Sequence, residues 1–161
     1  MDWILTALLF IGPSYVANGA PVLFGRGRPI DGGRNFADGR PIFGSHKTYR
    51  GFFAGIIAGT VFGFIEYPVN PIMPLAGFLI GTGAVLGDLL GAFAKRRLGI
   101  KPGDPLPIVD QLDFVFGGIL VGSLVYPMGW ASILLVVLVT PPIHLATNYG
   151  AYLLKLKKTY C

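Results

Sequence analysis

Five long apolar stretches, with little chain between them, constrain the fold of this protein more than any other feature. A helix that crosses a bilayer needs roughly 20 mostly apolar residues. The stretches cover residues 3–24, 51–67, 71–93, 112–126 and 128–154, the fourth being the shortest. Only 13% of the 161 residues are charged, against roughly 25% in soluble domains, so most of the surface is expected to face lipid. The sequence predicts an all-α integral membrane protein, with one domain over residues 1–161 built as a bundle of five transmembrane helices.

The basic residues predict the orientation of these helices. All of them fall between the first and second stretches, between the third and fourth, or after the fifth: Arg26, Arg28, Arg34, Arg40, Lys47, Arg50, Lys95, Arg96, Arg97, Lys101, Lys155, Lys157 and Lys158. With five crossings these segments share one side, and the positive-inside rule makes that side cytoplasmic. We therefore expect a multi-pass protein of the cell membrane with its N-terminus outside and its C-terminus in the cytoplasm. The pI of about 9.5 is then a topology signal and does not indicate binding to nucleic acid.

Three aspartates lie at the predicted cytoplasmic boundary. Asp88 is near the inner end of the third stretch, and Lys95, seven residues later, shares its helix face. Asp110 and Asp113 share a face at the start of the fourth stretch. Because Mg²⁺ binds one or two carboxylates together with substrate phosphates, and ionisable groups at membrane depth are usually functional, a magnesium site is predicted. The alternative is structural: Asp110 caps a helix and Asp88 pairs with Lys95, which leaves Asp113 unexplained.

A second polar segment, residues 44–51, opens the second stretch. It offers hydroxyls from Ser45 and Thr48 and positive charges from Lys47 and Arg50. Amides at the start of a helix favour anions, so the segment is a candidate phosphate-binding site, although it is not a Walker A loop. An N-cap flanked by snorkelling basic side chains would produce the same pattern.

The remaining polar residues in the stretches give weaker signals. His144 and Asn148 share a helix face, an arrangement more typical of hydrogen bonding between helices than of catalysis. Asn18 lies within the first stretch and requires a polar partner. The sequence shows no Ser-His-Asp arrangement, and its one cysteine, Cys161, is the last residue. Transfer of a phosphoryl or nucleotidyl group needs neither, because positioning and charge neutralisation do most of the work.

Small residues predict how closely the helices pack. Gly51, Gly55, Gly59 and Gly63 recur at every fourth position of the second stretch. On a helix they line one face, and such a face allows another helix to approach closely. We interpret this pattern as helix packing and not as a ligand site.

Several of these residues, in order, resemble motifs of the CDP-diacylglycerol synthase family of membrane cytidylyltransferases. The resemblance rests on Ser45, Lys47, Thr48 and Gly51, then on Gly87, Asp88, Lys95, Arg96, Lys101, Asp110 and Asp113. One segment departs, because residues 105–109 read Pro-Leu-Pro-Ile-Val where the family typically has Pro-Gly-His-Gly-Gly. Further similarity to the archaeal branch, the CDP-archaeol synthases, lies at residues 15–18, 21–24, 29–31, 38–39, 140–144 and 148. The resemblance covers nearly the whole chain.

The resemblance implies a reaction and a set of site residues. CTP would transfer its cytidylyl group to an unsaturated archaeal ether-lipid phosphate, 2,3-bis-O-geranylgeranyl-glycerol 1-phosphate, releasing pyrophosphate during phospholipid synthesis. The catalytic residues would be Asp88, Lys95, Asp110 and Asp113, and Mg²⁺ would be held by the three aspartates. CTP or phosphate would contact Asn18, Asp31, Gly32, Ser45, Lys47, Thr48, Arg50, Lys95 and Arg96. The implied partners are CTP, the lipid phosphate and the bilayer, and a homodimer is left open.

Two other function classes fit parts of the pattern. A transporter would carry charges along a path through the membrane, whereas here they stop at the inner face and the outer half offers only Glu66. CDP-alcohol phosphotransferases and polyprenyl transferases also use aspartate-rich membrane motifs. The long aspartate-containing motif that CDP-alcohol phosphotransferases need is absent from this sequence. Polyprenyl transferases need two aspartate-rich motifs, and this sequence has only one. Dependence on CTP would distinguish the predicted enzyme from both.

Overall fold

The computed structural model describes residues 2–155, and the regular elements within that range are five α-helices. They are α1 (Trp3–Phe24), α2 (Tyr49–Glu66), α3 (Met73–Arg97), α4 (Val109–Gly122) and α5 (Trp130–Leu153). The predicted all-helical fold is confirmed. By length and composition α1, α3 and α5 are able to cross a membrane. Lys157, Lys158 and Cys161 lie outside the described residues.

The fourth helix differs most from its prediction. α4 begins three residues before and ends four residues before the predicted 112–126. An acidic residue is favourable in the first turn of a helix, so Asp110, which the prediction left outside the span, lies inside α4. Its 14 residues extend about 21 Å, less than the roughly 30 Å of a hydrocarbon core. Five crossings therefore stay a prediction for α2 and α4.

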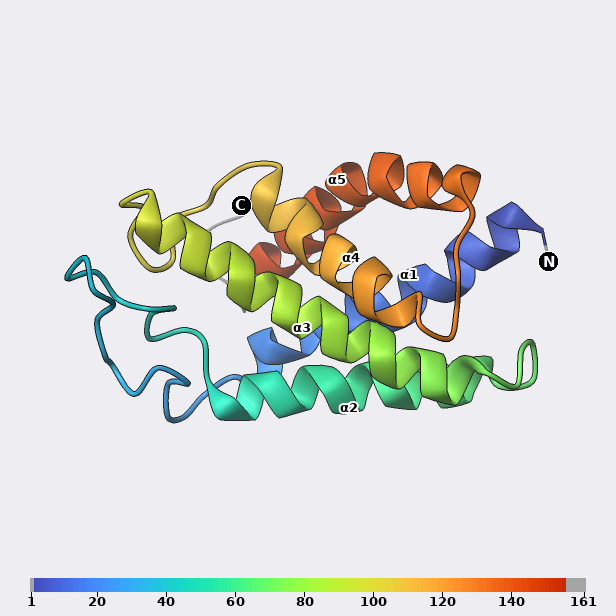
Figure 1. Ribbon diagram of the computed structural model, residues 1–161, viewed down its shortest axis with the longest axis horizontal. Coiled ribbons are helices and arrows are strands. Elements are labelled where there is room, and N and C mark those ends of the chain that lie inside the picture. The colour runs from blue at the N-terminus through green and yellow to red at the C-terminus, as the bar shows by residue number, and fades with distance from the viewer. Residues whose placement is uncertain (1, 156–161) are drawn as a thin grey trace.

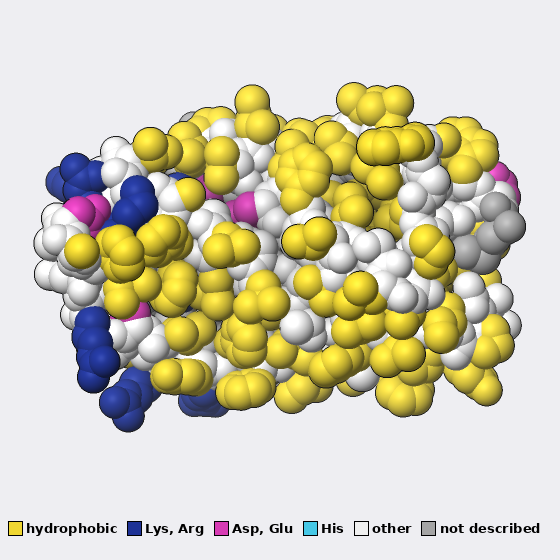
Figure 2. All heavy atoms as spheres, in the orientation of Figure 1, with side chains coloured by type: hydrophobic (Ala, Val, Ile, Leu, Met, Phe, Trp, Pro, Cys, Tyr) yellow, Lys and Arg dark blue, Asp and Glu magenta, His cyan; other side chains and the backbone are white. Residues whose placement is uncertain are grey.

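Successive helices run in opposite directions, with α3 between α2 and α4, and α5 at the edge of the bundle against α1 and α4 (Figure 1). The two long connections, residues 25–48 and 98–108, meet at one end, and the short ones lie at the other. On the face shown in Figure 2, Lys and Arg side chains gather at the end of the long connections, while hydrophobic side chains cover the remaining length. This distribution is that of a protein embedded in a membrane with one polar end.

The interior is small and is filled from four of the helices. Phe10 of α1, Ile80 of α3, Phe114 of α4 and Val136 of α5 are all at most 1% exposed. They belong to one apolar cluster. This cluster fixes α3 and α4 side by side, and α3 and α4 carry the predicted catalytic aspartates.

The glycine pattern of α2 forms its packing face, as predicted. The buried residues of α2 are Gly51, Gly55, Gly59 and Gly63. A methyl group at Gly59 would lie 2.9 Å from both the carbonyl oxygen of Gly77 and the Cα of Gly81 on α3. The opposite side of α3 contacts α4 in the same manner, with Gly83 and Gly87 against the backbone of Gly117 and Asp113. α3 therefore touches both neighbours through its backbone.

This packing predicts that Gly59→Ala lowers thermal stability in detergent. The added methyl group has no space, and overpacking costs about 1–3 kcal/mol, which exceeds the gain of about 1 kcal/mol in helix propensity. Gly19→Ala is the matched control, because a methyl group there meets nothing within 4 Å and the unfolding midpoint should stay level or rise. Equal midpoints for Gly59→Ala and Gly19→Ala would contradict the packing described.

Candidate active site

One threonine, Thr48, caps the start of α2. The hydroxyl of Thr48 accepts a hydrogen bond from the backbone N–H of Gly51 (3.1 Å) and donates one to the carbonyl of Gly25 (2.7 Å). Thr48 is therefore the N-cap of α2, as the structural interpretation of this segment required. The same hydroxyl fastens the end of α1 to the start of α2. Ser45 and Arg50, predicted to bind phosphate, are both exposed.

Asp31 organises the connection between α1 and α2. One carboxylate oxygen accepts the N–H of Gly33 (2.9 Å), and the other accepts the N–H groups of Phe43 (2.9 Å) and Gly44 (2.8 Å). Burial acts to raise the pKa of Asp31, but these hydrogen bonds outweigh it and hold the pKa below its ordinary value. The carboxylate is thus engaged by its own loop, with Gly32 exposed beside it. Contact of Asp31 and Gly32 with a nucleotide stays a prediction.

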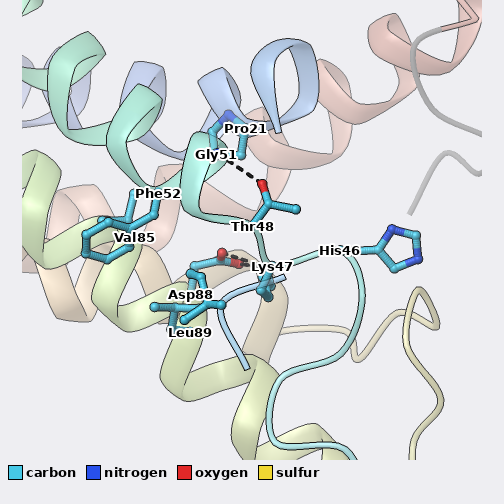
Figure 3. Close-up of a pocket in the computed structure, with 10 residues that line it drawn as sticks. Pro21, His46, Lys47, Thr48, Gly51, Phe52, Val85, Asp88 and Leu89 are labelled. Atoms are coloured by element: carbon cyan, nitrogen blue, oxygen red, sulfur yellow. Dashed lines mark hydrogen bonds and ion pairs between the residues drawn. The ribbon is translucent and has the colours of Figure 1, made fainter. Parts of the chain in front are cut away.

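Lys47 reaches from this loop to α3. Its ammonium lies 2.6 Å from both carboxylate oxygens of Asp88, and both side chains are about one quarter exposed. Figure 3 shows the pair between Thr48 and Leu89, with His46 pointing away from it. Two predicted site residues that are 41 positions apart in sequence are therefore in direct contact.

A second ion pair joins α3 to α4. The ammonium of Lys95 lies 2.6 Å from a carboxylate oxygen of Asp110 and 3.3 Å from the carbonyl of Asp104. The other oxygen of Asp110 accepts the backbone N–H of Leu106 (2.8 Å). The structural alternative is thus wrong on both points: Asp88 pairs with Lys47 and not Lys95, and the N-cap position of α4 is Ile108, with no side-chain cap. Both aspartates instead pair with lysines of other elements, Asp88 with Lys47 and Asp110 with Lys95. Spacing along one helix does not reveal such contacts.

Arg96 is the most enclosed charge of the site. It is 3% exposed, its Nε is buried without a hydrogen-bond partner, and within residues 2–155 its guanidinium forms no ion pair. Asp104 and Asp110 act on it electrostatically from beyond contact distance. A buried guanidinium without a partner is costly. A negatively charged ligand would offset that cost.

Two hollows lie on either side of Lys47. The polar hollow, of about 480 Å³, is lined by Lys95, Arg96, Asp104 and Asp110, among others. The amphipathic hollow, of about 320 Å³, is lined by Asp88 and Thr48 and by apolar residues: Pro21, Ile30, Phe52, Val85 and Leu89. His46 and Lys47 border both. The site is therefore divided into a charged side and a half-apolar side that share one lysine.

Comparison with known proteins gives a consistent result. Residues 1–161 match the model of the CarS-like family, described as CDP-archaeol synthase. The CDP-archaeol synthases of Pyrobaculum aerophilum, Methanopyrus kandleri and Pyrococcus furiosus are 49%, 46% and 44% identical to the chain. The matches cover 93%, 94% and 98% of the chain and 94%, 90% and 98% of the relatives. This chain belongs to the CDP-archaeol synthase family.

A solved structure supports the assignment to CDP-archaeol synthases. It is described as an intramembrane enzyme for archaeal membrane lipid biosynthesis, and it superposes with a TM-score of 0.85 at 37% identity. The match covers 91% of this chain and 98% of the other. The resemblance that the motifs predicted is confirmed, and the membrane-embedded character of the chain agrees with this neighbour.

The predicted magnesium ligands of this chain lie on facing helices. Asp113 contacts Gly91 of α3 and interacts electrostatically with Asp88, Lys47 and Asp110. Within residues 2–155, no three His, Cys, Asp or Glu side chains form a ready ligand set. The donors are nevertheless hard carboxylate oxygens on two neighbouring helices, a set that fits Mg²⁺ when substrate phosphates complete its coordination.

The other predicted polar residues within the helices line neither hollow. Asn18 is half-buried in α1. Asn148 is buried and lies with its amide nitrogen 3.3 Å from Nδ1 of His144. The ring of His144 packs 6.0 Å from that of Phe114. His144 and Asn148 contact each other within α5, so their predicted hydrogen bonding between helices stays a prediction.

The sequence reasoning missed a clamp on the polar loop. Arg97 binds the carboxylate of Asp38 (2.8 Å) and the carbonyls of Arg40 and Pro41, and it stacks 4.8 Å from the rings of Phe36 and Phe93. Arg40 in turn donates to the carbonyls of Arg96 and Arg97. The partners are 56 to 59 positions apart, so only the run of basic residues at the end of α3 hinted at them. The clamp holds the loop beside Arg96.

The clamp predicts that Arg97→Ala loosens residues 34–44. Hydrogen bonds to charged groups contribute about 1.5–3 kcal/mol, so amide exchange in this segment should accelerate at least about tenfold. Hydrogen–deuterium exchange in detergent measures it. Arg34→Ala is the control, because that exposed side chain has no hydrogen bond or ion pair within residues 2–155. Unchanged protection of residues 34–44 in Arg97→Ala would show that the clamp does not hold the loop.

Proposed function

We propose that this chain transfers the cytidylyl group of CTP to an archaeal ether-lipid phosphate, giving a CDP-lipid and pyrophosphate. Its relatives carry the name of this activity. The observation that carries the proposal is Arg96, a buried, unpaired guanidinium that lines a polar hollow beside Lys47 and Lys95. Three cations around one hollow suit the charge of a nucleoside triphosphate.

The chemistry asks little of a general base. The lipid phosphate is already ionised, with a second pKa near 6 for a phosphate monoester. One of its oxygens attacks the α-phosphorus of CTP in line, a new P–O bond forms, and the bond to pyrophosphate breaks. Arg96 and Lys95 neutralise the triphosphate, and Lys47, at the border of the two hollows, faces both reacting phosphates. Catalysis then rests on positioning and on charge neutralisation.

Mg²⁺ belongs to this proposal. Asp88, Asp110 and Asp113 would hold it, and when bound it would supply positive charge to the phosphates of CTP. In the structure Asp88 and Asp110 are engaged by Lys47 and Lys95. The phosphates of CTP attract the same lysines, so nucleotide binding favours release of both carboxylates.

The amphipathic hollow is the proposed place for the lipid head. Lys47 and Asp88 give it a charged wall, and Phe52, Val85 and Leu89 give it an apolar one. Isoprenoid tails would leave it laterally between helices into the bilayer. We place the polar end in the cytoplasm and let all five helices cross the membrane, because the positive-inside rule and the alternating helix directions agree.

The reaction is tested with purified protein in lipid nanodiscs, radiolabelled CTP, Mg²⁺ and a geranylgeranyl ether-lipid phosphate. We expect a CDP-lipid and an equal amount of pyrophosphate, and no product with EDTA. The same assay with dialkylglycerol in place of the phosphate should give nothing. Absence of product from folded protein with any lipid phosphate would refute the proposal and favour a transporter.

Asp110→Asn should reduce turnover by about 100-fold or more, because Lys95 loses its partner and the metal loses an anionic ligand. The fold should survive, since Asp110 is partly exposed in the first turn of α4. Asp2→Asn makes the same chemical change at the N-cap of α1, where asparagine caps as well as aspartate, and it should keep full activity. Thermal unfolding checks both variants, and full activity of folded Asp110→Asn would remove Asp110 from the site.

A further inference from the structure

Three arginines at the polar end belong to neither hollow. Arg26 and Arg28 follow α1, and Arg50 lies in the first turn of α2. All three are exposed. Within residues 2–155 none of their guanidinium groups forms an ion pair or hydrogen bond, whereas Lys47, Lys95 and Arg97 all hold carboxylates.

The backbone brings these arginines to one place. The carbonyl of Arg28 accepts the N–H of Tyr49 (3.2 Å), so the two segments run side by side at Arg28 and Tyr49, the residue before Arg50. Gly27, between Arg26 and Arg28, lies directly under the Arg50 side chain, since a methyl group there would be 3.1 Å from its Cδ. Three positive charges with no anion among them repel one another. Such a cluster is stabilised by a ligand that supplies negative charge.

The position of the cluster indicates the source of that charge. It adjoins the last residue of α1, Phe24 (57% exposed), and the first residue of α2, Tyr49 (48% exposed). Aromatic side chains at helix ends typify the membrane–water interface. Thr48 and Gly51, on either side of Tyr49 and Arg50, also line the amphipathic hollow. Apart from His46 and Lys47, which border both hollows, the polar hollow is lined by other segments, namely Phe43 and residues within 92–96 and 102–110. The cluster therefore borders the lipid side of the site.

We propose that Arg26, Arg28 and Arg50 form a docking patch for lipid-borne phosphate, which concentrates phosphate-headed lipids at the mouth of the amphipathic hollow. This inference rests on the proposed function for the step that follows docking. Arginine suits it, because its planar guanidinium binds phosphate through two parallel hydrogen bonds. A free nucleotide would not bind preferentially to a patch that lies among exposed apolar side chains beside the amphipathic hollow.

The kinetic test compares Arg26→Gln/Arg28→Gln with Arg34→Gln/Lys155→Gln. The control pair removes two exposed charges outside the patch. Turnover is measured in nanodiscs while the mole fraction of lipid phosphate is varied. Each basic residue near an anionic surface strengthens binding by about fivefold, so the patch variant should need about 10- to 30-fold more lipid phosphate for half-maximal rate. Its kcat and its KM for CTP should match the control, and equal lipid dependence in both variants would overturn the patch.

A binding test separates the patch from the reaction. Native mass spectrometry measures retention of dioleoyl phosphatidate, and of zwitterionic phosphatidylcholine, by each protein. The wild type and the control should retain phosphatidate preferentially, and the patch variant should lose that preference. Millimolar inorganic phosphate should not displace the bound phosphatidate, and displacement would assign the patch to free phosphate instead. One outcome separates the two proposals: the wild type makes no CDP-lipid, but phosphatidate retention is lost in the patch variant and kept in the wild type and the control. That outcome would support docking and contradict the proposed reaction.

Discussion

Backbone contact on both sides of α3 is the interaction on which the rest of the structure depends. Lipid tails are as apolar as leucine, so helices in a bilayer associate through close packing and not through the hydrophobic effect. Glycines on α2, α3 and α4 permit that packing, because they leave carbonyls and Cα atoms exposed to the neighbouring helix. The contact of Gly87 with the backbone of Asp113 brings Asp88 and Asp113 onto facing surfaces. Charged chemistry at the membrane edge thus depends on positions that have no side chain.

The charges of the site divide into those already balanced and those that are not. Lys47 and Lys95 hold carboxylates at 2.6 Å, which reduces the cost of keeping them partly buried. Arg96 has no such partner, although it is nearly inaccessible to water. It is also fixed in place, because Arg40 binds its carbonyl and Arg97 holds the adjoining loop. A site of this kind is prepared for an anion before the anion arrives.

The sequence was sufficient for the helices and singled out Lys47, Asp88, Lys95 and Asp110, which the structure brings into contact, but it did not give their pairing. Hydropathy located the five elements, and the basic segments indicated which ends share a side. It placed α4 several residues late, because apolar content does not mark a helix that starts with an acidic turn. The pairing of Lys47 with Asp88 depends on the path of residues 25–48, which hydrogen bonds from the backbone to Asp31 determine. Such long-range geometry leaves no periodic signal in one sequence.

The helical frame and the loop end of the molecule are held by forces that respond to different surroundings. The glycine contacts between α2, α3 and α4 are made of dispersion and backbone dipoles, which dissolved ions barely affect. The loop end is fastened by ion pairs at its surface, such as that of Arg97 with Asp38 (side chains 21% and 38% exposed), and these weaken as ionic strength rises. Salt therefore acts on the loop end while leaving the helical frame intact. Detergent and lipid composition act on the frame instead, so each can be varied to probe one half of the protein.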